Sequence, residues 1–362
     1  MSVASGPGAR RALVVGTGLI GGSVGKALRS AGWHVSGTDL DRRAEAAALA
    51  VGAVDAVGDD PGAELVVVAT PLRATVAGVQ RALAGHAHPG LVVTDVAAVK
   101  TGVVAAVEHP RFVGGHPMAG SEQVGVAGAR GDLFVGATWV LTPTRTTDPQ
   151  AFTALRSVVT SLGAEVVALS PEQHDALVAV VSHVPHLTAA TLMNLAGSLA
   201  EEHAALLRLA AGGFRDMTRV AAGDPRIWPD VCVANAPAIV PVLDRLVSDL
   251  TAMRDLVAGG DGAGVLATLD RAAGARRALP VGGRPPEHLA EVRVPVPDRP
   301  GVLAQITTLA GDMGLNVFDV EIAHSTEGDR GVLVLVVDAT GADRLQKALG
   351  VQGFQASWRE VV

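Results

Sequence analysis

The stretch Val14-Val15-Gly16-Thr17-Gly18-Leu19-Ile20-Gly21 decides the fold, because an apolar run breaks there into the pattern G-x-G-x-x-G. Gly16 permits a tight turn after a strand, Gly18 lets a ligand approach the backbone, and Gly21 lets the following helix pack close to the sheet. Asp39 ends a second apolar run, where an acid can bind a ribose. The pattern predicts a dinucleotide at the start of the helix. The expected cofactor contacts here are Gly16, Gly18, Leu19, Ile20, Gly21 and Asp39.

The acid at Asp39 favours NAD as the coenzyme. A carboxylate accepts hydrogen bonds from the ribose 2'-hydroxyl and repels a 2'-phosphate. Arg42 and Arg43 follow closely, and a guanidinium there would accommodate that phosphate. NADP therefore remains the less favoured alternative.

Composition limits the class of protein. The chain has 362 residues, of which 49% are hydrophobic and 18% charged, so it can bury several cores. The net charge of -7 includes no long block of one sign, and nothing favours a nucleic-acid or membrane surface. A single cysteine, Cys232, excludes an internal disulfide framework and a multi-cysteine zinc site. Because no apolar leader is visible near the N-terminus, we expect a cytoplasmic protein.

Residues 1–169 are expected to form an α/β Rossmann-type, doubly wound domain. Apolar, β-branched runs without polar alternation are separated by Ala/Leu/Arg stretches, which predicts parallel strands covered by helices on both faces. The runs are 13–15, 35–37, 65–69, 91–94, 112–113, 138–141 and 165–169. Such sheets bind ligands at the carboxyl ends of their strands. We therefore expect Thr70, Pro71 and Asp95 to line the cofactor crevice.

Residues 170–283 are expected to form an all-α domain. The strand signature disappears, and Ala/Leu/Val segments at helical spacing cover 171–181, 187–211, 229–257 and 264–279. So much apolar side chain on so few elements predicts burial against a second copy, and a homodimer is the commonest such assembly.

Residues 284–362 are expected to form an α+β ferredoxin-like domain after a Pro/Gly-rich linker at 280–286. Strands at 291–296, 316–322, 332–338 and 354–361 and helices at 300–313 and 342–349 give the order βαββαβ. Pro300 is expected to start the first helix, and Gly301 to let a ligand approach the backbone.

The segment 114–122, GGHPMAGSE, carries the first catalytic candidate, His116. It follows a short apolar strand, so we expect the histidine to lie at the carboxyl edge of the sheet, where the cofactor is expected to bind. An imidazole titrates near neutrality and can take a hydroxyl proton while a hydride leaves the same carbon. Ser121 and Glu122 are candidates for binding or orienting the substrate. The alternative is a solvent-exposed loop histidine.

The segment 182–186, SHVPH, places His183 and His186 on one face of a helical turn. Zinc is disfavoured, because two histidines alone leave a structural site short of ligands, and we expect no metal. Core or capping histidines are a second alternative. Hydrogen bonding to a substrate is favoured over both.

The segment 212–219, GGFRDMTR, is followed by DPRIW at 224–228. Arg215 and Arg219 are a candidate binding site for an anion, because a guanidinium can form two parallel hydrogen bonds with a carboxylate. Asp216 lies between them in the sequence and could hold a guanidinium in the required orientation. Alone, these residues would fit a solvated helix face equally well.

Together these clusters resemble the prephenate dehydrogenase family, which oxidises and decarboxylates prephenate to 4-hydroxyphenylpyruvate in tyrosine biosynthesis. The matching motifs, in the family's order, are GTGLIGGS, Asp39, ATP at 69–71, TDVAAVK from Thr94, GGHPMAGSE, SHVPH, GGFRDMTR and DPRIW. The C-terminal unit, with DRPGVL at 298–303 and GLN at 314–316, resembles an ACT domain, a sensor that often binds amino acids between paired copies.

The resemblance implies roles for individual residues in a cleft between the first two domains. His116 is the implied base, with Ser182 and Arg219 as its catalytic partners, and Arg219 holds a substrate carboxylate. The implied substrate contacts are Ser121, Glu122, His183, His186, Gly212, Asp216, Arg219 and Trp228. Tyrosine or another aromatic amino acid is the implied effector. Its implied contacts are Asp298, Pro300, Gly301, Val302, Leu303 and Asn316.

One position departs from the family pattern. Family members commonly have G-S-V-K where this chain has Ala97-Ala98-Val99-Lys100, so a hydroxyl near the catalytic histidine is missing. We expect water or a neighbouring hydroxyl to replace it, at a modest loss of rate.

Three rival functions remain. Arogenate dehydrogenase performs the same reaction on the amino form of the side chain. β-Hydroxy acid dehydrogenases rely on a lysine in the helical domain, and residues 170–279 contain none. A non-catalytic amino-acid sensor is the third, against which the intact His116 and Arg219 argue.

Overall fold

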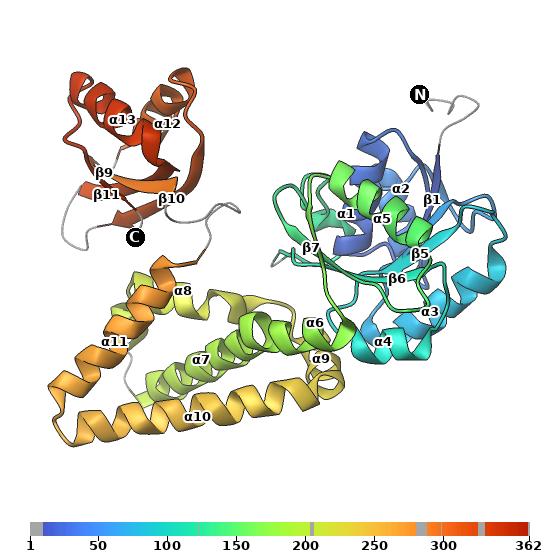
Figure 1. Cartoon of the computed structure of the whole chain (residues 1–362), viewed down its shortest axis with the longest axis horizontal. Coiled ribbons are helices and arrows are strands. Elements are labelled where there is room, and N and C mark those ends of the chain that lie inside the picture. The colour runs from blue at the N-terminus through green and yellow to red at the C-terminus, as the bar shows by residue number, and fades with distance from the viewer. Residues whose placement is uncertain are drawn as a thin grey trace. The chain divides into compact units, whose positions relative to one another are not determined.

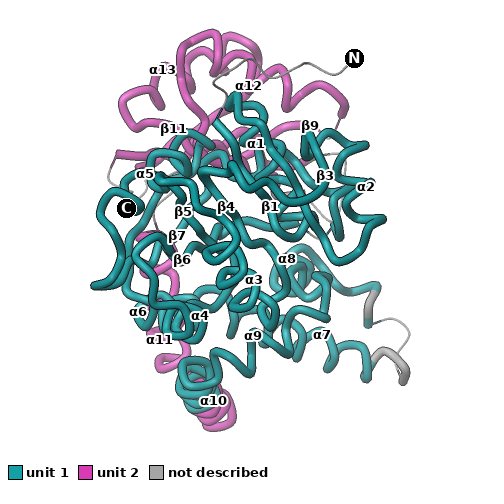
Figure 2. The backbone as a smooth tube through the Cα atoms, turned by 90° about the vertical axis from the view of Figure 1, so that its right-hand side faces the viewer, with its two compact units in different colours: residues 1–248 teal, residues 249–362 magenta. Residues whose placement is uncertain are grey.

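The computed structural model describes residues 10–121, 123–202, 206–279, 288–297, 299–324 and 330–360 (Figure 1). The chain divides into two compact units, Met1–Ser248 and Asp249–Val362 (Figure 2). This division falls inside helix α10 (Ala236–Ala258), whereas the sequence suggested three domains.

The first unit contains an eight-stranded sheet in the order β3-β2-β1-β4-β5-β6-β7-β8. The strands are β1 (Arg11–Val15), β2 (His34–Thr38), β3 (Ala56–Val57), β4 (Leu65–Val68), β5 (Val92–Asp95), β6 (Phe112–Pro117), β7 (Thr138–Thr142) and β8 (Glu165–Ala168).

The expectation of an all-parallel sheet is wrong at one edge. β6 and β7 pair antiparallel, so β7 and β8 run opposite to the other strands. A parallel pair needs a crossover that returns the chain to the other end of the sheet. Between β6 and β7 the described chain has only the short 3-10 helix η1 (Val126–Gly128), so β7 starts at the edge where β6 ends.

Helices cover both faces of this sheet. In β1, Ala12 and Val14 join the core cluster that contains α1 (Leu19–Ser30), α2 (Arg42–Ala50) and α5 (Pro149–Ser161). Leu13 points to the other face and packs in the cluster with α3 (Leu72–Gly85) and α4 (Thr101–Ala106). Because neighbouring residues of a strand face opposite ways, one apolar run fills both cores, as the absence of polar alternation predicts.

The rest of the first unit is helical, as expected. Its elements are α6 (Pro171–Val178), the π-helical turn η2 (Ala179–His183), α7 (Val184–Glu202), η3 (Leu206–Leu209), α8 (Gly212–Thr218), η4 (Arg219–Ala222), η5 (Pro225–Ile227), α9 (Trp228–Ala234) and the first part of α10. The run Pro171–Leu199 is long and apolar enough to cross a membrane by length and composition. However, it carries the buried polar residues His174, Asp175 and His183, which bond to other parts of the protein.

The second unit contains the end of α10, α11 (Gly262–Arg277) and the βαββαβ domain. The latter comprises β9 (Leu289–Pro297), α12 (Val302–Asp312), β10 (Val317–His324), β11 (Arg330–Asp338), α13 (Ala339–Val351) and β12 (Ser357–Glu360). Its sheet is antiparallel in the order β10-β11-β9-β12, which confirms the ferredoxin-like expectation. Helix α12 begins at Val302 rather than Pro300, because Gly301 adopts a left-handed conformation with φ of 90°.

Candidate active site

The glycine-rich loop between β1 and α1 has the geometry that its sequence predicts. Gly16 has a φ of 94°, and a Cβ there would lie 2.5 Å from the carbonyl oxygen of Ala69. A Cβ on Gly21 would lie 1.9 Å from the carbonyl oxygen of Gly16, so only glycine allows α1 to approach the strand this closely. Gly18 is different, because a Cβ there would meet open space.

The start of α1 fits a dinucleotide phosphate. Gly18 is the N-cap of the helix, and no described side chain caps it. The first amides of a helix, here those of Leu19 and Ile20, point towards its N-terminal end and favour an anion. Asp39 lies beside this loop, since its Oδ2 accepts hydrogen bonds from the Thr17 amide at 2.8 Å and the Thr17 hydroxyl at 3.2 Å.

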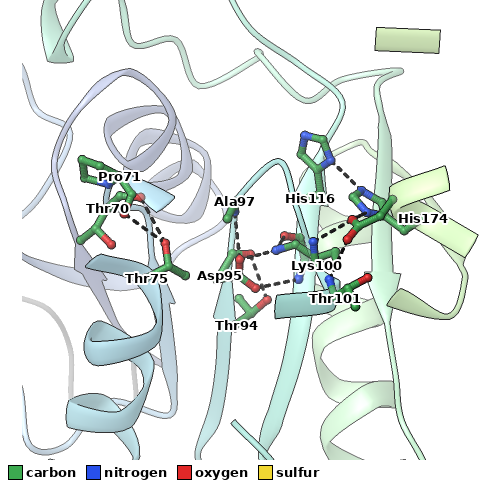
Figure 3. Close-up of polar contacts among 12 residues, drawn as sticks. Thr70, Pro71, Thr75, Thr94, Asp95, Ala97, Lys100, Thr101, His116 and His174 are labelled. Carbon is green, nitrogen blue, oxygen red and sulfur yellow. Dashed lines mark hydrogen bonds and ion pairs between the residues drawn. The ribbon is translucent and has the colours of Figure 1, made fainter. Parts of the chain in front are cut away.

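Thr70, Pro71 and Asp95 follow the carboxyl ends of neighbouring strands, as expected. The pairing of β1, β4 and β5 aligns Val15, Val68 and Asp95 at one edge of the sheet. Pro71 is the N-cap of α3, and the buried hydroxyl of Thr70 has no hydrogen-bond partner within the described chain (Figure 3).

Asp95 differs from the expectation, because its side chain is fully buried among protein donors. Its Oδ2 accepts from the Ala97 amide at 2.9 Å and from Nζ of Lys100, and its Oδ1 accepts from the Gly115 amide at 3.2 Å. Lys100 also donates to the Gly115 carbonyl at 2.7 Å. Burial lowers the pKa of Lys100, against the opposing effect of the Asp95 carboxylate. The pair therefore supports β6 just before His116, and it offers no carboxylate to the crevice.

His116 belongs to a chain of hydrogen bonds that the sequence did not reveal. Its Nδ1 lies 2.8 Å from Nε2 of His174, and Nδ1 of His174 lies 2.7 Å from Oδ1 of Asp175 (Figure 3). Both His174 and Asp175 are buried on α6. Asp175 also accepts from the backbone amides of Lys100 and Thr101, each at 2.8 Å, which joins α6 to the start of α4.

The surroundings of His116 favour a neutral imidazole. Burial holds the pKa of His116 well below 6.5, and the ionisable neighbours His174, Lys100 and His183 further disfavour a positive charge on this imidazole. Burial alone would raise the pKa of Asp175, but hydrogen bonds from His174, Thr101 and Lys100 outweigh it and lower the pKa. Asp175 is therefore an ionised acceptor.

The replacement expected for the missing hydroxyl at Ala98, a water or a neighbouring hydroxyl, stays a prediction. His116 bonds to a further group that the resemblance did not imply, the imidazole of His174. His174 comes from α6, a distant part of the chain. The signal in the sequence is the His-Asp pair within an apolar helical segment.

His183 and His186 share an aromatic neighbour, Trp228. The ring of His186 stacks on Trp228 at a centroid distance of 3.6 Å, and His183 meets it edge-on at 6.1 Å. Asn235, also missed in the sequence, donates from Nδ2 to Nδ1 of His183 at 3.1 Å and to the Asp175 carbonyl at 2.9 Å. Burial lowers the pKa of His183 to about 4, so this imidazole is neutral, with its proton on Nε2.

The remaining substrate candidates lie at the surface or outside the described residues. Ser182 lies in η2 and is partly buried, and Ser121 is exposed and accepts from the Gln123 amide at 3.1 Å. Gly212 and Asp216 lie on α8, and Arg219 begins η4; all three are exposed. A Cβ on Gly223, after η4, would lie 3.8 Å from His186, which places η4 beside that histidine. Glu122 lies outside the described residues.

The expected effector residues divide between two ends of the C-terminal sheet. Gly301 precedes α12, whereas Asn316 follows it and adjoins the start of β10. Since β9 and β10 both lie against β11, Asn316 lies near the first residues of β9 and Gly301 beyond its last. One copy therefore cannot bring both to one small ligand. Asp298 lies outside the described residues, Val302 is buried and Leu303 is exposed.

Three family models match the chain in succession. The nucleotide-binding domain of prephenate dehydrogenase matches residues 24–168, its dimerization domain matches residues 170–271, and the ACT domain matches residues 290–352.

Similar proteins cover most of the chain. Prephenate dehydrogenase of Bacillus subtilis is 33% identical over 89% of this chain and 90% of its own length. Cyclohexadienyl dehydrogenase of Zymomonas mobilis is 33% identical over 74% of this chain and 94% of its own. A crystal structure of Aquifex aeolicus prephenate dehydrogenase with hydroxyphenyl propionate and NAD+ is 28% identical with a TM-score of 0.69, covering 74% of this chain and 97% of that one. Synechocystis arogenate dehydrogenase is 31% identical with a TM-score of 0.62, covering 74% and 98%. The chain belongs to the prephenate dehydrogenase family, a family of oxidoreductases.

Proposed function

We propose that this protein is an NAD-dependent prephenate dehydrogenase, which oxidises and decarboxylates prephenate to 4-hydroxyphenylpyruvate. The observation that carries the proposal is the position of His116 at the carboxyl edge of the sheet that also holds the Gly16–Gly18 loop, in surroundings that lower the pKa of the imidazole. The similarity of most of the chain to prephenate dehydrogenases supports the substrate.

His116 acts as the general base. Its Nδ1 is engaged by His174, so Nε2 is the atom available to accept the proton of the ring hydroxyl. When bound, NAD accepts the hydride from the carbon that carries this hydroxyl. The carbonyl that forms there accepts the electron pair released as the ring carboxylate leaves as CO2, which makes the ring aromatic. The resulting phenolate oxygen then takes a proton back from His116.

The helical part of the first unit binds the substrate. Arg219 holds a carboxylate, because a guanidinium forms two parallel hydrogen bonds with it. His183, neutral and protonated on Nε2, donates to a substrate oxygen, and Ser182 in the same turn adds a hydroxyl. The further contacts of this proposal are Ser121, Glu122, His186, Gly212, Asp216 and Trp228.

The coenzyme is NAD, held at Gly16–Gly21, Asp39, Thr70 and Pro71. The open space at Gly18, the uncapped start of α1 and the carboxylate of Asp39 support this assignment. Asp39 would repel the 2'-phosphate of NADP. Comparing kcat/KM for the two coenzymes tests the choice, and a preference for NADP would reject it.

The active form is a homodimer located in the cytoplasm. The match of residues 170–271 to a dimerization domain supports the dimer. So does the apolar surface of α10 and α11, where only Ile239 is buried among the described residues. The exposed apolar side chains are Val240, Val247, Leu250, Val257, Leu266 and Leu269. Light scattering should give twice the chain mass of 36.6 kDa.

We also propose that the chain divides into three domains, at 1–169, 170–283 and 284–362. The effector of the last domain is tyrosine or another aromatic amino acid. The ACT match at residues 290–352 supports this regulation. The separation of Gly301 from Asn316 favours a site between two copies of the domain.

The decisive experiment is a coenzyme-reduction assay with prephenate. The wild type should reduce NAD and form 4-hydroxyphenylpyruvate, and His116→Asn should lose about 10² to 10⁴ in kcat, the usual contribution of a general base. Arogenate is assayed in parallel, and a higher kcat/KM with arogenate than with prephenate would favour the arogenate dehydrogenase alternative. No reduction with either substrate would reject the enzyme and favour a sensor.

A further inference from the structure

The buried pair His174 and Asp175 has no role in the proposed chemistry so far. His174 is fully buried, and its two ring nitrogens lie 2.8 Å from Nδ1 of His116 and 2.7 Å from Oδ1 of Asp175. A buried polar side chain usually serves structure alone. Here, however, one of its partners is the proposed base.

The order of protons along this chain follows from the acceptor at its end. Asp175 receives two backbone amides and is ionised, so it can only accept from Nδ1 of His174. With a single ring proton, His174 carries it on Nδ1, towards Asp175, and has a lone pair on Nε2. That lone pair can accept only if Nδ1 of His116 carries the proton, and Nε2 of His116 is then bare.

We propose, on the basis of the function proposed above, that His174 is a positioning residue that fixes His116 as the Nδ1-protonated tautomer, with Asp175 setting the tautomer of His174 in turn. The contact also fixes the direction of the His116 ring. In a free imidazole either nitrogen can carry the proton, so without this contact part of the His116 population has a protonated Nε2 and cannot accept a proton there.

The same pair links substrate binding to the base. The Asp175 carbonyl accepts from Asn235, and Asn235 also donates to His183 at 3.1 Å. The carbonyl of Asp175 is therefore connected to His183 through Asn235. Its carboxylate is connected to His116 through His174. One residue of α6 thus orients both imidazoles, which fits a requirement that base and substrate donor keep opposite tautomers: Nδ1–H in His116 and Nε2–H in His183.

NMR of isotope-labelled histidine side chains in the full chain tests the tautomer directly, without any substrate. The signals of His116 are identified by their loss in His116→Gln. We expect wild-type His116 to be protonated on Nδ1 near neutral pH, and His174→Leu to shift it towards Nε2. A wild-type His116 protonated on Nε2 would overturn the proposal.

Kinetics gives an independent test. His174→Leu should lower kcat by about 100-fold with little change in KM, since a general base contributes about 10² to 10⁴. His174→Gln keeps an oxygen that can accept from His116, so it should recover part of that loss. The matched control is His86→Gln, because His86 is also buried but its partners lie outside the His116 chain: its Nδ1 is 2.9 Å from the Ala82 carbonyl and its Nε2 is 3.1 Å from the Asp59 carboxylate. It should keep the wild-type kcat.

The outcomes separate this proposal from the proposed function. Folded His174 variants with wild-type kcat would overturn the positioning role while leaving the dehydrogenase intact. A wild type inactive on both substrates would reject the dehydrogenase, and the tautomer measurement would still decide the role of His174. If His174→Leu fails to fold, the wild-type tautomer and the Gln variant decide the matter.

Discussion

At the scale of single residues, the role proposed for His116 predicts how the reaction depends on pH. The base must be neutral to accept a proton, and its pKa lies well below 6.5 because of burial and the neighbouring His174, Lys100 and His183. Protonation abolishes activity, so kcat/KM should stay level around neutrality and fall only as pH drops below 6.5. Initial rates across the acid range, at low prephenate concentration, measure this limb because kcat/KM reports the free enzyme. A midpoint at or above 6.5 would contradict the environment assigned to this histidine.

Asn235 gives a second prediction at this scale. It is buried and donates to both His183 and the Asp175 carbonyl. In Asn235→Ala both acceptors lose their partner, at a cost of about 1–3 kcal/mol in unfolding free energy for a buried unpaired group. KM for prephenate should also rise, because the His183 tautomer is no longer fixed. Denaturant unfolding and steady-state kinetics measure the two effects.

Asn194→Ala is the matched control for that change. Asn194 is exposed on α7, so its replacement should leave both stability and KM close to wild type. Equal effects of the two substitutions would show that the buried amide has no special role.

At the scale of elements, two glycines of one loop have separable roles. Gly21→Ala places a Cβ 1.9 Å from the Gly16 carbonyl, so α1 must move away from the sheet, and we expect a loss of at least about 1–3 kcal/mol in stability from this overpacking. Gly18→Ala places its Cβ in open space and should fold normally. It should nevertheless weaken NAD binding, because the phosphates approach the backbone there.

Calorimetric titration with NAD and thermal unfolding of both variants distinguish the two roles. Gly18→Ala should keep the wild-type Tm and lose affinity, while Gly21→Ala should lose Tm. Unchanged NAD affinity in Gly18→Ala would place the pyrophosphate elsewhere.

The same loop explains how much of the fold was predictable. Gly16, Gly18 and Gly21 act through local backbone geometry, which neighbouring residues encode, so the turn and the strand–helix packing were correctly predicted. The apolar runs likewise predicted the sheet and the βαββαβ unit. The reversed direction of β7 was missed, because it does not depend on the residues of the strand itself. It depends on the connection after β6, whose described residues form no crossover that would return the chain to the other end of the sheet.

The site was predictable only in part, for a related reason. His116 stands in a local motif at the end of a strand, and its position could be predicted. Its partner His174 lies 58 residues away, and Asn235 lies 52 residues from His183. Contacts of this kind arise only when α6, α9 and the sheet pack together. Asp95 was placed correctly at the sheet edge, but its burial with Lys100 also depends on that packing.

At the scale of the whole molecule, we expect the βαββαβ domain to be separable from the unit that contains His116. Its sheet and helices enclose their own core around Ile306, Leu335 and Leu345, and its residues belong to a different compact unit from His116. A chain truncated after Arg284 should therefore keep its turnover of prephenate, whereas inhibition by tyrosine should disappear.

Asn316→Ala in the full chain tests the same regulation without truncation. Asn316 is exposed, and because it is separated from Gly301 by α12, an effector that needs both must lie between two copies. The substitution should weaken tyrosine inhibition and leave kcat unchanged, while Gln355→Ala, also exposed in this domain, should change neither. Inhibition curves at fixed prephenate measure the difference. If inhibition persisted unchanged in the truncated chain, tyrosine would be acting at the active site, and the inhibition should then be competitive with prephenate.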